Sequence, residues 1–186
     1  MEETFDKEAW LQELEEAREQ AAEYYLERFD WRGVRVPEGF DGPRYYPPDE
    51  RWRVRARLDR QAPGSGVRVE LPTSIGDMRE FDTYGTFLFS LDDREHRLTA
   101  YRPVPVYPEY DELFVPFRDA TSGKETYGAG RYLDVPRLEG DDYILDFNFA
   151  YNPSCAYSPR WNCPYPPPQN HLRVAVEAGE KVPFEH

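Results

Sequence analysis

Apolar residues near the start of the chain recur with the spacing of an α-helix. Over residues 5–29, steps of three and four positions separate Trp10, Leu14, Ala17, Ala21 and Tyr24. Glutamates occupy much of the remaining surface, and Thr4 or Asp6 is suited to cap the first turn. Gly33 and Pro37 end the pattern. We therefore expect one amphipathic helix that packs against the rest of the chain.

The apolar period changes to two from residue 51 onward, which is the spacing of a half-buried strand. Arginines alternate here with Trp52, Val54, Ala56 and Leu58. Further strands are expected at 67–71, 78–83, 85–91, 96–102, 112–118, 130–135, 143–149 and 172–177. The chain shows no alternation of strands with helices. The predicted fold is therefore mainly β, an antiparallel barrel or sandwich preceded by one N-terminal α-helix.

Length and aromatic content indicate one folded domain. A chain of 186 residues can bury a sizeable core, and 16% aromatic residues argue against disorder. We expect residues 1–30 to form a helix packed on the domain, and residues 31–186 to form a single β-rich domain. No stretch approaches the roughly 20 apolar residues of a membrane span, and the first residues do not resemble a signal peptide. The expected location is cytoplasmic, with no membrane partner.

The charge balance excludes further classes of partner. The chain has 36 acidic and 23 basic residues, a net charge of -13 and a pI near 4.7. This field repels phosphate backbones, so no nucleic-acid partner is expected. Only Lys7, Lys124 and Lys181 are lysines, and the other basic residues are arginines. An acid excess with scarce lysine resembles proteins of salt-loving cells, and arginine-rich codon usage is the alternative.

A polar, glycine-rich stretch over 117–134 is the first candidate site. Its candidate ligand-binding residues are Asp119, Thr121, Lys124, Tyr127 and Arg131. Glycine lets backbone N–H groups approach an anion closely, and the lysine and arginine supply charge. The stretch lacks the first glycine of a phosphate-binding P-loop and the third glycine of a dinucleotide fingerprint. The alternative is a polar loop held together by an Asp119–Arg131 pair.

The second candidate segment, residues 146–171, is rich in proline and aromatic residues. It contains the polar candidates Asp146, Asn148, Tyr151 and Asn152. Cys155, Cys163 and His171 follow at steps of eight residues, whereas zinc ligands are usually closer in pairs. We therefore expect no metal, and no disulfide in a reducing cytosol. The thiols are either buried or functional, and Cys155 is a nucleophile only if a base such as His171 approaches it.

Long motifs in both segments resemble a known family. The stretches YPPDERWRV, LFVPFRDATSGKETYGAGRYLD, LDFNFAYNPSCAYSPRWNCPYPPPQN and AGEK are similar to domain of unknown function family 1684, of uncharacterised bacterial and archaeal proteins, over residues 43–181. Many members have a longer N-terminal half. The resemblance implies which residues are shared, but not what they do. The matching positions are Asp119, Thr121, Lys124, Tyr127, Arg131, Asp146, Asn148, Tyr151, Asn152, Cys155, Cys163, Asn170 and Lys181.

These observations favour binding of a small anionic molecule at the mouth of the barrel. Tyr127, Tyr151 and Tyr157 would line the site, Lys124 and Arg131 would bind the anion, and Asp146, Asn148 and Asn152 would orient it. Hairpin pairing is expected to place Arg131 and Asp146 on neighbouring strands. One alternative is a hydrolase or transferase that uses Cys155 or the Asp119/Lys124 pair. Others are a split-barrel flavin-binding protein, or a structural role for both segments. The pattern defines no cofactor and no oligomeric state.

Overall fold

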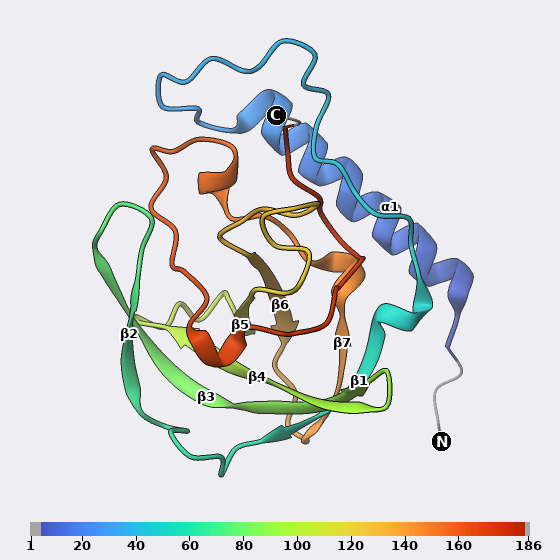
Figure 1. The fold of residues 1–186 in the computed structure, drawn as a ribbon, viewed down its shortest axis with the longest axis vertical. Helices are drawn as coiled ribbons and strands as arrows, with labels where there is room; N and C mark the ends of the chain where they lie inside the picture. Colours follow the sequence, from blue (N-terminus) through green and yellow to red (C-terminus); the bar gives the residue numbers. More distant parts are fainter. Residues whose placement is uncertain (1–4, 185–186) are drawn as a thin grey trace.

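The computed structural model, which describes residues 5–184, contains one long helix beside a curled antiparallel sheet (Figure 1). Helix α1 spans Lys7–Glu23 and continues into a π-helical turn at Tyr24–Arg28. The strands are β1 (Arg53–Asp59), β2 (Arg68–Pro72), β3 (Met78–Leu91), β4 (Arg94–Pro103), β5 (Glu112–Phe117), β6 (Arg131–Pro136) and β7 (Asp142–Asp146). Short 3-10 turns occupy Glu50–Trp52, Phe147–Phe149, Ser154–Ala156 and Pro168–Asn170. The predicted class, mainly β after one N-terminal helix, is confirmed.

Helix α1 begins at a side-chain cap and buries one narrow stripe. The Asp6 carboxylate accepts hydrogen bonds from the backbone N–H groups of Glu8 and Ala9, both at 3.1 Å. The other capping candidate, Thr4, lies outside the described residues. Trp10 and Leu14 are the buried residues of the helix. Within residues 5–184, no helix is both long and apolar enough to cross a membrane.

The sheet is ordered β6-β5-β4-β3-β1-β7, with β2 beside the first half of β3. Strand β3 merges two expected strands, because its pairing with β4 shifts register at Gly85 and the ladder continues beyond the shift. A Cβ at Gly85 would lie 2.9 Å from the carbonyl oxygen of Asp59, so only glycine fits where β1 crosses the bend. The bulge turns the long strand and curls the sheet into a half-barrel.

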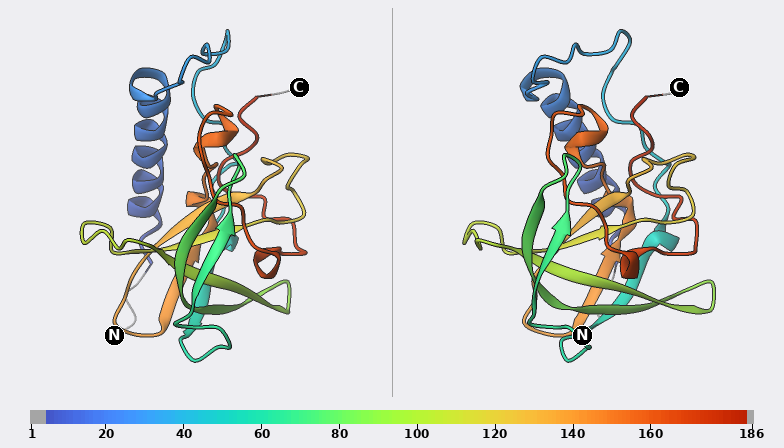
Figure 2. Two further views of the ribbon diagram at one scale, coloured as in Figure 1. Left: turned by 90° about the vertical axis from the view of Figure 1, so that its left-hand side faces the viewer. Right: turned by 60° about the vertical axis from the view of Figure 1, so that its left-hand side comes forward.

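Among residues 5–184, strands β6 and β7 at the two ends of the curled sheet do not pair with each other, and only an isolated bridge joins Tyr132 of β6 to Tyr151, five residues after β7. Strand β6 pairs with β5, and β7 pairs with β1. The expectation that pairing would place Arg131 and Asp146 on neighbouring strands was therefore wrong. The first turns of α1 approach this gap: Trp10 lines a pocket with residues of both strands, and its Nε1 donates to Asp146 Oδ2 at 2.8 Å. Figure 2 shows the helix standing at one side of the sheet.

The concave face of the sheet is covered by the chain that follows β7. The inward positions of β1 are buried, as its alternation predicted. In Figure 1 the red C-terminal segment crosses in front of the sheet. Residues 172–177 were expected to form a strand there, and this was wrong. They run extended beside residues 118–120 with only scattered backbone bonds, including Leu172 N to Arg118 O at 2.7 Å and Ala120 N to Val174 O at 3.0 Å.

Candidate functional site

Arg131 lies at the start of β6 and is completely buried. Its Nη1 donates to the carbonyl oxygens of Ala178 and Glu180, and its Nη2 donates to the carbonyl oxygen of Val176 at 2.9 Å. The same Nη2 lies 3.3 Å from Asp119 Oδ2. Burial lowers the pKa of Arg131, and the Asp119 carboxylate opposes that shift. The guanidinium therefore holds the C-terminal segment in place, with its two terminal nitrogens directed at protein acceptors.

The Asp119 carboxylate organises the loop that connects β5 to β6. Its Oδ2 accepts the backbone N–H of Val176 at 2.6 Å, and its Oδ1 accepts the hydroxyl of Thr121 at 2.8 Å. Thr121 also bonds to Thr126 across the loop at 2.8 Å. Within residues 5–184 no ion pair joins Asp119 to Lys124, the pair considered as a catalytic unit. The buried side chains close the loop at its base, and Lys124 is exposed at its tip.

A pocket of about 670 Å³ opens beside this loop. We call it the basic pocket. It is lined by Arg44, Gly123, Lys124, Glu125, Thr126, Tyr127, Gly128, Lys181, Val182 and Phe184. The cations come from three segments, which two backbone bonds fasten together: Lys181 N to Arg44 O at 2.7 Å, and Val182 N to Glu125 O at 2.9 Å. Two of the three lysines of the chain thus line one pocket.

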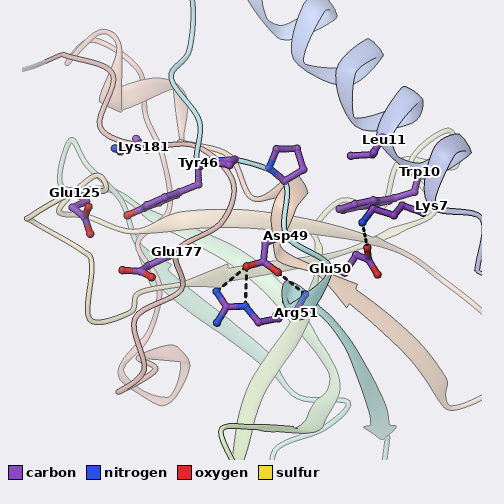
Figure 3. A pocket seen from close by; sticks show the side chains of 12 residues that line it. Lys7, Trp10, Leu11, Tyr46, Asp49, Glu50, Arg51, Glu125, Glu177 and Lys181 are labelled. Carbon is purple, nitrogen blue, oxygen red and sulfur yellow. Dashed lines mark hydrogen bonds and ion pairs between the residues drawn. The ribbon is translucent and has the colours of Figure 1, made fainter.

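A neighbouring pocket of about 760 Å³ shares Glu125 and Lys181 with the basic pocket (Figure 3). Its other charges are mostly paired with one another, because Lys7 lies 2.5 Å from Glu50 and Arg51 lies 2.7 Å from Asp49. The ammonium of Lys181 lies 5.1 Å from the centre of the Tyr46 ring between the two pockets. Most of the charged side chains in this neighbouring pocket are therefore already paired with one another.

Asp146 and Asn148 fasten the segment before β1 and do not line the basic pocket. Asp146 Oδ2 accepts from Trp10 Nε1 and, at 3.0 Å, from Arg53 Nε. Asn148 bonds both backbone groups of Asp49, each at 2.9 Å, and donates to Asp146 Oδ1 at 2.8 Å. The Asp146 side chain also accepts the backbone N–H of Asn148, which ends β7 earlier than the expected strand 143–149.

Asn152 and Tyr157 contact the C-terminal segment from the other side. Asn152 Nδ2 donates at 2.8 Å to the carbonyl of Lys181, whose residue lines the basic pocket. Tyr157 donates its hydroxyl to Glu180 Oε2 at 2.9 Å and stacks on Tyr25, with ring centres 3.9 Å apart. Of the three tyrosines expected to line one site, the basic pocket contains Tyr127 alone.

Glu180, a buried carboxyl group of this network, was not among the residues expected from sequence. It is buried, and its Oε2 also accepts the backbone N–H of Asn152 at 2.8 Å. Loss of hydration on burial raises its pKa to about 7, and the bonds from Asn152 and Tyr157 and the charge of Arg131 limit the rise. A lone glutamate in the family stretch AGEK gives no local signal of burial, because its partners lie elsewhere in the sequence.

Cys155 and Cys163 are both buried free cysteines. The backbone N–H of Cys155 lies 3.2 Å from Cys163 Sγ, and the Tyr127 hydroxyl lies 3.8 Å from Cys155 Sγ. Hydrogen bonding from the Cys163 thiol lowers the pKa of Cys155 to about 7, and the same contact raises the pKa of Cys163. His171 is exposed and contacts the carbonyl of Pro166 at 3.3 Å. Residues 5–184 contain no group of three or more His, Cys, Asp or Glu side chains placed to bind a metal.

Comparison with known proteins adds a family and a fold. A family model described as protein of unknown function (DUF1684) matches residues 38–181. The chain is similar to an uncharacterised protein from Haloarcula marismortui whose structure was determined by solution NMR. The two have 35% sequence identity and a TM-score of 0.74, over 97% of this chain and 98% of that chain. A search of curated proteins found no match.

Proposed function

Because the chain belongs to the DUF1684 family of proteins of unknown function, we propose a function from its own residues: it binds a small anionic ligand in the basic pocket. One observation carries the proposal. Arg44, Lys124 and Lys181 come from three separate segments and line one cavity, in a chain whose net charge is -13. A local group of cations in an acidic protein focuses the field on that cavity and attracts an anion.

The other residues of the pocket suit a ligand with an anionic head and an apolar body. Gly123 and Gly128 leave room for an anion close to the backbone. Tyr127 and Phe184 provide aromatic walls. Polar groups converging in a partly apolar cleft are the usual composition of a small-molecule site. The anion-binding partner of Lys124 in this proposal is Lys181, in place of the Arg131 expected from sequence.

The proposal is tested by NMR titration of the ¹⁵N-labelled full chain with phenyl phosphate, using benzyl alcohol as the uncharged comparison. The amide signals of Gly123, Gly128 and Lys181 should shift with phenyl phosphate and hardly move with benzyl alcohol. Lys124→Gln and Lys181→Gln should each weaken binding about tenfold, because each removes a charge-assisted contact of roughly 1.5 kcal/mol. Added salt should also weaken binding.

Lys7 supplies the matched control, because it is the remaining lysine and does not line the basic pocket. Lys7→Gln changes the net charge by the same amount as the two test variants and should leave the affinity unchanged. If all three variants weakened phenyl phosphate binding equally, the effect would come from the net charge of the protein and not from the basic pocket. Absence of phosphate-dependent shifts at Gly123 and Gly128 would remove the proposal.

A further inference from the structure

A further cavity, of about 280 Å³, has five aromatic rings in its lining. We call it the aromatic pocket. Its lining consists of Arg79, Phe81, Pro103, Tyr110, Glu112, Phe114, Tyr132, Asp134, Tyr151 and Pro164. None of these residues lines the basic pocket. They come from β3, β4, β5 and β6, from the loop before β5 and from the chain after β7.

The aromatic rings form one continuous wall. Phe81 stacks on Phe114 with ring centres 5.4 Å apart and an interplanar angle of 18°. Phe114 contacts the edge of Tyr132 at 4.7 Å, and Tyr132 contacts Tyr151 at 5.7 Å. Tyr110 adds an exposed ring at the rim, with 64% of its surface accessible. Interlocked rings fix the wall before any ligand arrives, so ordering it costs a ligand little.

Two carboxylates stand beside this wall on neighbouring strands. Asp134 of β6 pairs in register with Phe114 of β5, and Glu112 lies two positions further along β5. Asp134 accepts the Tyr151 hydroxyl at 2.6 Å. Within residues 5–184 neither carboxylate forms an ion pair with a cationic side chain. The two acids therefore add negative charge to the pocket without a balancing partner.

The pKa of Asp134 lies above its usual range, although both carboxylates are at the exposed surface of the pocket. Partial loss of hydration raises the pKa to about 6, the Tyr151 hydroxyl opposes the rise and the nearby Glu112 charge adds to it. Arg79 is the cation in the lining, and its Nη2 donates to the carbonyl of Asn162 at 3.0 Å. With one guanidinium and two carboxylates in its lining, the pocket has a net negative charge.

Aromatic faces and an uncompensated carboxylate together select a particular ligand chemistry. The negative face of an aromatic ring attracts an ammonium ion, most strongly where little water competes. A carboxylate adds charge attraction, and the apolar rings suit the methyl groups of an alkylated ammonium. We propose that the aromatic pocket is a second binding site, separate from the basic pocket, which takes a small organic cation with a methylated ammonium head group.

The test uses choline and its uncharged carbon isostere, 3,3-dimethylbutan-1-ol, in parallel NMR titrations of the full chain. Choline should shift the amide signals around Phe114, Asp134 and Tyr151. The isostere has nearly the same shape and should bind at least about tenfold more weakly, because it lacks the charge that the rings and carboxylates attract. Equal affinity of the two probes, or choline shifts confined to other parts of the chain, would overturn the proposal.

Variants separate the contributions of the ring and the carboxylate. Tyr110 is mostly exposed, so its replacement leaves the core intact. Tyr110→Leu should reduce choline affinity about two- to fivefold, whereas Tyr110→Phe keeps the ring and the affinity. Asp134→Asn should reduce the affinity about tenfold, and Asp142→Asn, an exposed acid on β7, should not. Choline affinity unchanged in Asp134→Asn would refute the site. Lys124→Gln should leave choline binding as in the wild type, which keeps this test independent of the basic pocket.

Discussion

Glutamine in place of Glu180 should remove a pH-dependent loss of stability from the core. The carboxyl group is buried, and its pKa rises from 4.5 to about 7 on folding. The folded chain therefore binds this proton more tightly than the unfolded chain does. As a result, the contribution of Glu180 to stability falls as the pH rises from 4.5 to about 7, and is constant above that range.

The magnitude follows from the size of the shift. A rise of about 2.5 pH units at 1.36 kcal/mol per unit corresponds to roughly 3 kcal/mol, of which about 2.5 kcal/mol falls between pH 5 and pH 8. Glutamine keeps an oxygen that can accept from Asn152 N and Tyr157 OH, so the network retains its hydrogen bonds. The stability of Glu180→Gln relative to the wild type should therefore increase by about 2.5 kcal/mol from pH 5 to pH 8.

The assay is urea unfolding followed by tryptophan fluorescence, at fixed potassium chloride and at several pH values. Other acidic groups titrate in the same range, so the informative quantity is the difference between variant and wild type at each pH. Glu177→Gln is the matched control, because Glu177 is an exposed acid in the same segment. Its difference from the wild type should show no step. A difference for Glu180→Gln that is flat, or that shrinks with rising pH, would refute the reasoning.

Three further predictions concern the contacts of Arg131 with Asp119 and the C-terminal segment (the Arg131 clamp), the two thiols and the charged surface. Arg131→Met should lower the free energy of unfolding, measured by urea titration, by about 3–5 kcal/mol, because it leaves the Asp119 carboxylate buried and unpaired. Adding Asp119→Asn to this variant should recover part of the loss. In the folded chain, iodoacetamide should alkylate Cys155 before Cys163 near neutral pH, because the pKa of Cys155 is the lower of the two. Peptide mass spectrometry that gives the reverse order would contradict this assignment of the pKa values. The melting temperature should rise from low to molar potassium chloride at pH 7 and rise much less at the pI of about 4.7, whereas a flat response at pH 7 would leave codon usage to explain the scarce lysines.

Periodicity predicted the elements in which one face packs on the core and the other faces solvent. Strand β1 alternates between core and surface along its whole length, so the sequence pattern from Val54 to Leu58 identifies it as a strand. The segment 172–177 has a similar apolar content and forms no strand. Its backbone groups bond to the side chains of Asp119 and Arg131, which belong to a loop and a strand far away in sequence. Periodicity detects burial, and it does not detect which partner satisfies the backbone.

The candidate site was predicted in part for the same reason. Lys124 and Tyr127 are close in sequence and do line one cavity, whereas Arg44 and Lys181 join them only through the fold. Arg131 was grouped with Lys124 because both residues are basic and close together in the sequence. In β6 the side chain of Arg131 points into the core and is fully buried, so its position in the strand decides its surroundings.

The sequence separation between Arg131 and the residues that it binds also affects folding during synthesis. The carbonyl groups that Arg131 binds belong to Val176, Ala178 and Glu180, which lie 45, 47 and 49 residues after it in the chain and so leave the ribosome later. Until they arrive, closing the sheet around Arg131 would bury a charge without its acceptors, at a cost of several kcal/mol. The nascent chain therefore stays open at this point. The core around Arg131 is completed only once residues 176–180 have been synthesised, and until then the exposed strands are accessible to chaperones.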